Sequence, residues 1–191
     1  MINRREVLTI GLAGLASLQL QTIAGAHSVR KKKKFKLDKK YEPQTVKFRG
    51  YKRGTIVVDP KNHFLYLVEG FGKARRYGVG VGRAGLAFKG SANIKRKAKW
   101  PSWTPTANMI KREPHKYKKF AGGVPGGPEN PLGARALYLY KGNRDTYYRI
   151  HGTTQPDSIG RSVSNGCIRM INDHVIDLYN RVPVGTTVVV L

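Results

Sequence analysis

Short runs of apolar and β-branched residues recur along the chain from residue 55 onward and predict a mostly β domain. Residues 55–59 form one such run, residues 59–62 are typical of a turn, and residues 63–69 continue as a second strand, so we expect a hairpin here. Residues 77–82 alternate glycine with Tyr and Val, which predicts a third strand where another backbone comes close. Further strands are predicted at residues 134–140, 146–150 and 186–191.

A helix is predicted near the C-terminus, because four apolar residues there fall at i, i+3, i+4 and i+7: Val175, Leu178, Tyr179 and Val182. Asn172 is expected to cap its start. Residues 108–117 predict a shorter helix broken by Pro114, and the glycine- and proline-rich residues 122–133 predict an ordered surface loop. We therefore expect a single domain of strands with one or two packed helices.

The first 26 residues have the pattern of an export signal. Arg4 and Arg5 precede a moderately apolar stretch at residues 7–20, and Ala24-Gly25-Ala26 fits a signal-peptidase site. Residues 3–8 also resemble the twin-arginine motif, and an ordinary secretory signal or a membrane anchor are the alternatives. We expect cleavage to leave a chain that begins at His27, located in the periplasm or elsewhere in the cell envelope.

Charge narrows the choice of partners. The 191 residues include 36 Lys and Arg against 11 Asp and Glu, a formal net charge of +25, which implies a polyanionic neighbour. Outside the cytoplasm nucleic acid is a poor partner, whereas cell-wall peptides and anionic lipids are available. Residues 27–50 are predicted to be a basic flexible arm, and Arg30–Lys40 is expected to meet an anionic envelope surface or to be only a solvated linker. The folded domain is then residues 51–191.

The informative chemistry lies between residues 150 and 170. The chain has one cysteine, Cys167, which excludes an internal disulfide and a CxxC motif. It follows Asn165-Gly166, a dipeptide that favours a tight exposed turn. His151 lies 16 positions upstream, at the end of a predicted strand, so a loop can bring its imidazole to the sulfur. No metal-ligand spacing accompanies these residues, and the alternative is a buried structural cysteine with a core histidine.

A cysteine and a histidine in this arrangement suit nucleophilic catalysis. Only the thiolate is a good nucleophile, and an imidazole can accept the thiol proton and later return one to a leaving amine. Gly166 would let a substrate approach the backbone, which leaves the N–H of Cys167 free to stabilise an oxyanion.

His151-Gly152-Thr153 together with Ser164-Asn165-Gly166-Cys167-Ile168-Arg169-Met170 resembles the signature of the L,D-transpeptidase (YkuD-type) catalytic domain family, in its ErfK-, YbiS-, YcfS- and YnhG-like branch. The likeness extends over residues 52–191 and includes residues 54–59, 125–133 and 185–188. One departure is Asn165, where many members carry histidine.

The resemblance implies a β-sandwich-like domain and a reaction that needs no cofactor and no metal. In the family, the cysteine attacks the bond between the third residue, a diamino acid, and the fourth, D-alanine, of a peptidoglycan stem tetrapeptide. Carried over, Cys167 is the nucleophile and His151 the general base and then acid. The backbone at Gly166 and Cys167 would form the oxyanion hole, and Ser164 would shape the turn.

Roles for the remaining residues also follow from the resemblance. The backbone carbonyl of Gly152 would orient the imidazole, with Asp157 as a carboxylate alternative. Arg169 would meet a substrate carboxylate or hold the turn of the motif together. Tyr148 and Trp103 would line the peptide groove, although aromatic residues in a β domain also serve as core.

The acyl acceptor is left open by the sequence. It could be an amine of a second stem peptide, giving a 3→3 cross-link, a free D-amino acid, or an outer-membrane protein or lipoprotein. Water as acceptor would make the protein an L,D-carboxypeptidase or hydrolase. A non-catalytic wall-binding module is the third alternative, which an intact Cys/His pair disfavours.

Overall fold

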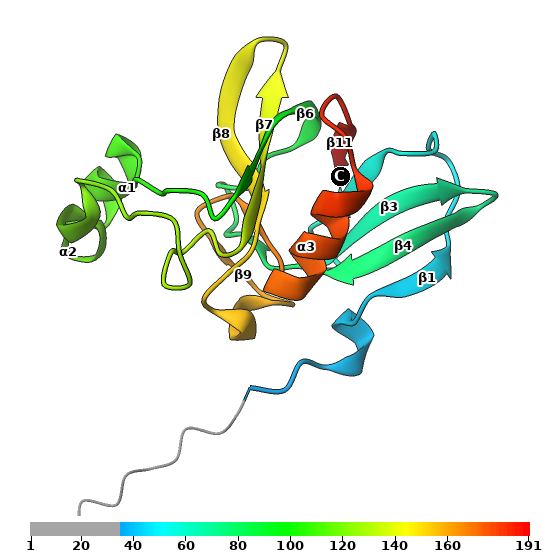
Figure 1. Cartoon of the computed structure of the whole chain (residues 1–191), viewed down its shortest axis with the longest axis horizontal. Coiled ribbons are helices and arrows are strands. Elements are labelled where there is room, and N and C mark those ends of the chain that lie inside the picture. Colours follow the sequence, from blue (N-terminus) through cyan, green and yellow to red (C-terminus); the bar gives the residue numbers. More distant parts are fainter. Residues whose placement is uncertain (1–34) are drawn as a thin grey trace, which may run out of the picture. The chain divides into compact units, whose positions relative to one another are not determined.

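The computed structural model describes residues 35–191, so the predicted export signal lies outside the described residues. Figure 1 shows this unit as a set of strands with a few short helices. The strands are β1 (Gln44–Lys47), β2 (Ile56–Asp59), β3 (Phe64–Gly70), β4 (Lys73–Gly78), β5 (Val81–Gly82), β6 (Gly90–Lys99), β7 (Arg135–Lys141), β8 (Arg144–His151), β9 (Ser162–Ser164), β10 (Ile168–Arg169) and β11 (Thr187–Val190). The helices are α1 (Ala107–Arg112), α2 (Pro114–Tyr117), α3 (Asn172–Arg181) and the 3-10 turns η1 (Lys39–Tyr41), η2 (Lys118–Phe120) and η3 (Pro156–Ser158).

Nine of these strands form one sheet in the order β1-β4-β3-β2-β11-β6-β7-β8-β10, and β5 pairs with β9 in a second, two-stranded sheet. Neighbours are antiparallel except for β11 with β2, β10 with β8, and β5 with β9, which are parallel. The hairpin predicted from residues 55–69 is confirmed as β2–β3, with Val57 opposite Tyr66. No helix within residues 35–191 is long and apolar enough to cross a membrane.

The core is one cluster to which both halves of the large sheet contribute. Ile56 and Leu65 come from one half, Leu137 and Ile150 from the other, and all four are fully buried. The predicted C-terminal helix is confirmed as α3, which packs on β7 and β8. The predicted mostly β architecture is therefore confirmed, with α3 as the helix that covers the sheet.

The glycines of the predicted third strand lie where backbones meet. The predicted strand is divided into the end of β4 and the short β5. Gly80 exchanges two backbone hydrogen bonds with Arg169, at 2.8 and 2.9 Å, and a Cβ on Gly80 would lie 2.5 Å from the Ser158 carbonyl. A Cβ on Gly82 would lie 2.8 Å from the Cα of Gly166. The predicted close approach is confirmed, and it holds the residues after Cys167 against the sheet.

The predicted flexible arm is wrong for its last part. Residues 39–41 form η1 and residues 44–47 form β1, which pairs with β4 from Gln44 to Lys47. The physical reason is a set of aromatic contacts that residue spacing does not reveal. Tyr41 packs on Phe64, Phe48 stacks on Tyr66 at 4.3 Å, and Tyr51 stacks on Phe48 at 5.8 Å. These rings cover the face of β3 that points away from the core cluster.

We expect Phe48→Ala to lower the free energy of unfolding by about 1–3 kcal/mol, because it removes a half-buried ring and two stacking partners. The matched control is Phe71→Ala in the β3–β4 turn, where the side chain is 98% exposed and the expected change is within about 0.5 kcal/mol. Urea unfolding of the two variants measures the difference. Equal effects would contradict the structural role of the β1 segment.

Candidate active site

The turn that carries the cysteine is built around the hydroxyl of Ser164. Its Oγ accepts a hydrogen bond from the Gly166 N–H at 3.1 Å and donates one to the Cys167 carbonyl at 2.6 Å. Gly166 has φ +122°, and a Cβ there would lie 2.4 Å from the Tyr148 ring. Only glycine fits this position, and the predicted role of Ser164 in shaping the turn is supported by its two hydrogen bonds.

The thiol of Cys167 is half-buried and lies against β8. Its Sγ donates a long hydrogen bond to the Tyr147 carbonyl at 3.8 Å. Burial raises the pKa of the thiol above its usual value, although the Arg149 backbone and the charges of Arg149 and Arg169 oppose that rise. The free protein therefore keeps the proton on sulfur at neutral pH.

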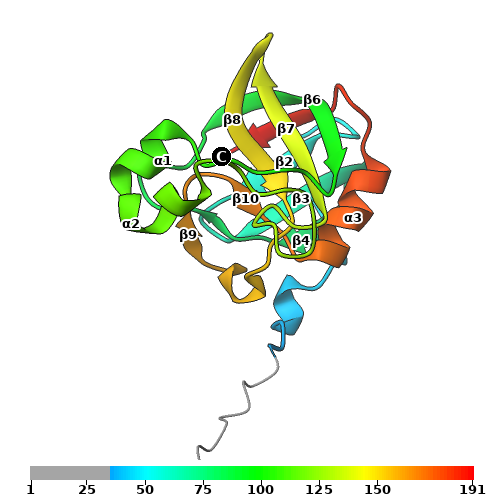
Figure 2. The ribbon, with the colours of Figure 1, turned by 60° about the vertical axis from the view of Figure 1, so that its left-hand side comes forward.

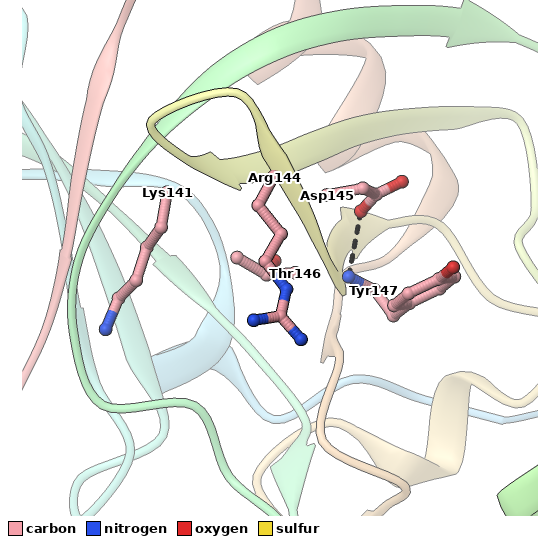
Figure 3. Close-up of a pocket in the computed structure, with 5 residues that line it drawn as sticks. All are labelled: Lys141, Arg144, Asp145, Thr146 and Tyr147. Atoms are coloured by element: carbon pink, nitrogen blue, oxygen red, sulfur yellow. Dashed lines mark hydrogen bonds between the residues drawn. The ribbon is translucent and has the colours of Figure 1, made fainter.

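A bulge in β8 presents that carbonyl. The register between β7 and β8 shifts after Tyr138, and Tyr147 has φ +61°. Two side chains hold the bulge, as the Tyr147 N–H donates to Asp145 Oδ1 at 2.8 Å and the Tyr148 N–H donates to Thr146 Oγ1 at 3.2 Å. Figure 3 shows the first bond in a pocket of about 260 Å³ along this hairpin. The bulge thus points a backbone acceptor at the turn that carries Cys167.

His151 ends β8 and is buried, with 4% of its surface exposed. Its Nδ1 lies 2.6 Å from the Gly152 carbonyl. Because a carbonyl only accepts, Nδ1 carries the hydrogen and Nε2 has a free lone pair. Burial, and then the charge of Arg169, lowers the pKa of the imidazole to about 3, while the carbonyls of Gly152 and Leu132 oppose this. The ring is a neutral base at physiological pH.

The contact expected between the Gly152 carbonyl and the imidazole is therefore present, and the carboxylate alternative is wrong. The Asp157 side chain is exposed and lies 4.0 Å from Arg161, on the solvent side of η3. Within residues 35–191 no hydrogen bond joins its carboxylate to the His151 ring, whose Nδ1 is engaged by the Gly152 carbonyl.

Contrary to the prediction, Asn172 does not cap α3 with its side chain but holds the backbone beside the imidazole. It is the first residue of α3, and its Oδ1 accepts from the Ala134 N–H at 3.0 Å and the Thr153 N–H at 3.3 Å. A Cβ on Gly152 or Gly133 would lie 2.1 or 2.3 Å from this oxygen. The amide therefore joins the strand that begins after Gly133 to the loop after His151.

Cys167 and His151 line the same groove, whose volume is about 1060 Å³. Cys167 directly precedes β10, which is a parallel neighbour of β8, and Arg169 lies opposite His151 in the register. Among residues 35–191 no hydrogen bond joins the sulfur to the imidazole. The structure thus brings the two predicted residues to one cavity, with the thiol proton held by a backbone carbonyl.

Other predicted site residues are also placed on this groove. Tyr148 and Trp103 both line it, and the Tyr148 hydroxyl donates to the Leu86 carbonyl at 3.1 Å. Arg169 lines it too, and its Nη1 donates to Gln155 Oε1 at 3.0 Å. The proposed oxyanion hole changes in one respect, because the Gly166 N–H is engaged by Ser164 and is not free for a substrate.

Asn165 is the centre of contacts that sequence reasoning missed. Its Oδ1 accepts from Arg83 Nη2 at 2.9 Å and from Arg112 Nη2 at 3.0 Å, and its Nδ2 donates to the Tyr117 hydroxyl at 2.7 Å. Glu113 completes the set by accepting from Arg83 at 2.7 Å. Three of these partners lie in the helical segment between β6 and β7, which no local pattern connects to residue 165.

Comparison with known families agrees with this geometry. The model of the YkuD family, described as the L,D-transpeptidase catalytic domain, matches residues 53–190. The chain therefore belongs to the L,D-transpeptidase catalytic domain family.

Curated relatives carry the same family name. The chain is 32% identical over 151 residues to the probable L,D-transpeptidase ErfK/SrfK of Escherichia coli, covering 78% of this chain and 46% of that protein. It is 31% identical over 208 residues to a putative L,D-transpeptidase of Fuscovulum blasticum, covering 100% of this chain and 98% of that protein. The chain thus spans about half the length of the E. coli relative.

Two solved structures have a fold similar to that of this chain. A Brucella melitensis protein described as a probable carnitine operon oxidoreductase is 61% identical, with a TM-score of 0.56 over 81% of this chain and 96% of that chain. An Enterococcus faecium L,D-transpeptidase is 16% identical, with a TM-score of 0.54 over 72% of this chain and 49% of that chain, a likeness of fold alone.

The low pKa of His151 predicts how the free energy of unfolding depends on pH. The unfolded imidazole takes up a proton near pH 6.5, whereas the folded one does so near pH 3, so between these values the unfolded state binds more protons. Stability is therefore full above pH 6.5 and falls on acidification toward pH 3, with a contribution from this group of up to about 1.4 kcal/mol per pH unit.

We expect His151→Gln to remove that contribution, so that its free energy of unfolding falls less steeply between pH 6.5 and 4 than that of the parent protein. Denaturant titrations at several pH values measure both slopes. Because the carboxylates and the other histidines are present in both proteins, their effects cancel in the difference. Identical slopes would mean that His151 titrates normally in the folded chain.

Proposed function

We propose that the protein is a cysteine-dependent peptidoglycan L,D-transpeptidase. The observation that carries the proposal is that Cys167 and His151 line one groove. Nδ1 of His151 donates its hydrogen to the Gly152 carbonyl, which leaves the lone pair of Nε2 free to accept a proton. Membership of the L,D-transpeptidase family supports the reaction class. The substrate proposed is the stem tetrapeptide, cleaved between its diamino acid and its terminal D-alanine.

In the first half-reaction the thiol leaves the Tyr147 carbonyl and gives its proton to Nε2 of His151. Because the pKa of the thiol is raised and that of the imidazole lowered, this transfer is coupled to attack on the substrate and does not precede it. Sγ bonds to the carbonyl carbon of the diamino acid, and the Cys167 N–H donates to the oxyanion. The C–N bond then breaks, Nε2 protonates the D-alanine nitrogen, and a thioester remains.

In the second half-reaction an amine replaces D-alanine in the groove. It gives a proton to Nε2, attacks the thioester carbonyl, and releases the cysteine sulfur, which takes the proton back. One amide bond is exchanged for another, so atoms and charges balance without a redox partner. A stem-peptide amine gives a 3→3 cross-link, a lysine of an envelope protein gives attachment, and water in place of the amine gives hydrolysis.

The proposed location is the cell envelope, since the substrate is found there and the first 26 residues have the pattern of an export signal. We propose that the basic run from Arg30 onward holds the domain near an anionic envelope surface. This run merges with folded residues, because Asp38 accepts a hydrogen bond from the Lys40 N–H at the start of η1. Lys39 and Lys40, at the end of the run, belong to this folded turn and are exposed.

Replacement of Cys167 by alanine tests the proposal. We expect Cys167→Ala to lower D-alanine release from a tetrapeptide by at least about 10³-fold, while the melting temperature stays within a few degrees of the parent. Val163→Ala, two residues before Asn165 on the same segment, is the control that should keep its activity. Mass spectrometry of muropeptides from treated sacculi then distinguishes cross-linking, protein attachment and hydrolysis. Undiminished release by Cys167→Ala would overturn the cysteine mechanism.

A second test concerns the basic run. We expect replacement of Lys31, Lys32, Lys33 and Lys34 by glutamine to weaken binding to isolated walls several-fold at about 50 mM salt and to have little effect at about 500 mM salt. Replacement of the same four residues by arginine keeps the charge and should bind like the parent. Co-sedimentation measures both. Equal binding by the glutamine variant at low salt would reduce the run to a spacer.

A further inference from the structure

Two arginines converge on one neutral oxygen beside the nucleophile turn. Arg83 and Arg112 both donate to Asn165 Oδ1, at 2.9 and 3.0 Å. The amide cannot flip, because its Nδ2 would then face two guanidinium donors; in the observed orientation Nδ2 donates to the Tyr117 hydroxyl at 2.7 Å. An amide oxygen satisfies the hydrogen bonds of the guanidinium groups but does not neutralise their charge.

The charges around this point do not balance. Glu113 is the carboxylate of the cluster, and it is engaged by Arg83 at 2.7 Å and by Lys116 at 3.5 Å. The hydrogen bond from Arg83 lowers the pKa of Glu113, so the carboxylate is ionised. Arg112 has no carboxylate partner within residues 35–191. The cluster therefore holds three cationic side chains and one anion, and only two of the cations contact that anion.

Arg112 lies where a substrate would pass, and Arg83 meets it at the Asn165 oxygen. Arg112 and Asn165 line the same groove as Cys167, and Asn165 is two residues before the nucleophile. Arg112 is the last residue of α1, which Figure 2 shows with α2 at one side of the strands. Arg83 lies across the turn, with its N–H donating to the Ser164 carbonyl at 3.0 Å. The guanidinium groups thus come from two separate elements and meet at the turn.

We propose that Arg83 and Arg112 form a carboxylate-binding site for the peptide that enters the groove. This inference rests on the proposed function, because it takes the stem peptide as the ligand. A carboxylate there would supply the missing negative charge and accept hydrogen bonds from the guanidinium groups. The site is distinct from Arg169, which donates to Gln155. Two sources offer this chemistry, namely the side-chain carboxylate of the diamino acid and the terminal carboxylate of D-alanine.

Three peptides distinguish the sources. One tetrapeptide keeps both carboxylates, a second has an amide at the diamino acid side chain, and a third has an amide at its C-terminus. We expect the parent protein to prefer the first peptide over one of the amides by about 10–100-fold in kcat/KM, with most of the difference in KM. The amide that is disfavoured identifies the carboxylate that is bound.

Arg112→Gln tests the role of the charge. We expect it to raise KM for the acid peptide by about 10–100-fold and to leave the value for the disfavoured amide nearly unchanged, so that the preference falls close to one. Arg112→Lys keeps the charge but loses the planar fork, and it should retain part of the preference. The matched control is Lys111→Gln, which removes one positive charge from the neighbouring exposed position of α1 and should keep the full preference.

Peptide binding to the Cys167→Ala variant, measured by calorimetry, separates this inference from the proposed function. Selective binding of the acid peptide that is lost in the double variant with Arg112→Gln supports the site even without turnover. Turnover without any preference between acid and amides overturns the site and leaves the proposed function intact. A loss of kcat/KM in Arg112→Gln that is equal for all three peptides also overturns it, since the arginine would then only hold Asn165 in place.

Discussion

The hydrogen bond from Nδ1 of His151 to the Gly152 carbonyl is the interaction on which the site depends. At 2.6 Å it fixes the tautomer and the plane of the ring, and it leaves Nε2 as the basic nitrogen. The bond requires the backbone after β8 to take one path, and Asn172 holds that path by accepting N–H groups from both adjoining segments. This backbone path also requires glycine at position 152, because a side chain there would clash with the Asn172 oxygen.

A neutral pair is the chemical consequence of this packing. The imidazole is buried among backbone carbonyls and near Arg169, which opposes a second positive charge, and the thiol is partly buried against the bulge of β8. A resting thiolate–imidazolium pair is therefore disfavoured, and in the proposed mechanism reactivity depends on a substrate carbonyl that accepts the electron pair as the proton moves. Such an arrangement protects the cysteine from random oxidation, since the thiolate is the reactive form.

The sequence was sufficient to predict those elements and contacts that a local residue pattern or a short motif determines. The β2–β3 hairpin, the strands β7, β8 and β11, the helix α3, and the partner of Nδ1 could all be predicted from spacing or from the family signature. What could not be predicted depends on side chains that meet over long distances in the chain. The stacking of Phe48 on Tyr66 holds the end of the expected arm against β3. Asn165 contacts Arg83 and Arg112, which are 82 and 53 residues away in the sequence. Asn172 is a residue type that often caps helices, yet its side-chain oxygen accepts hydrogen bonds from Ala134 and Thr153 instead of capping α3.

The central claim, a neutral His151 with its hydrogen on Nδ1, is tested most directly by nitrogen NMR of the protein labelled with ¹⁵N-histidine. The account predicts that from pH 8 to pH 4 the signals of His151 keep a protonated Nδ1 and an unprotonated Nε2, and that His151→Gln removes those signals. A ring that gains its second proton near pH 6.5, or that carries its hydrogen on Nε2, would contradict the account.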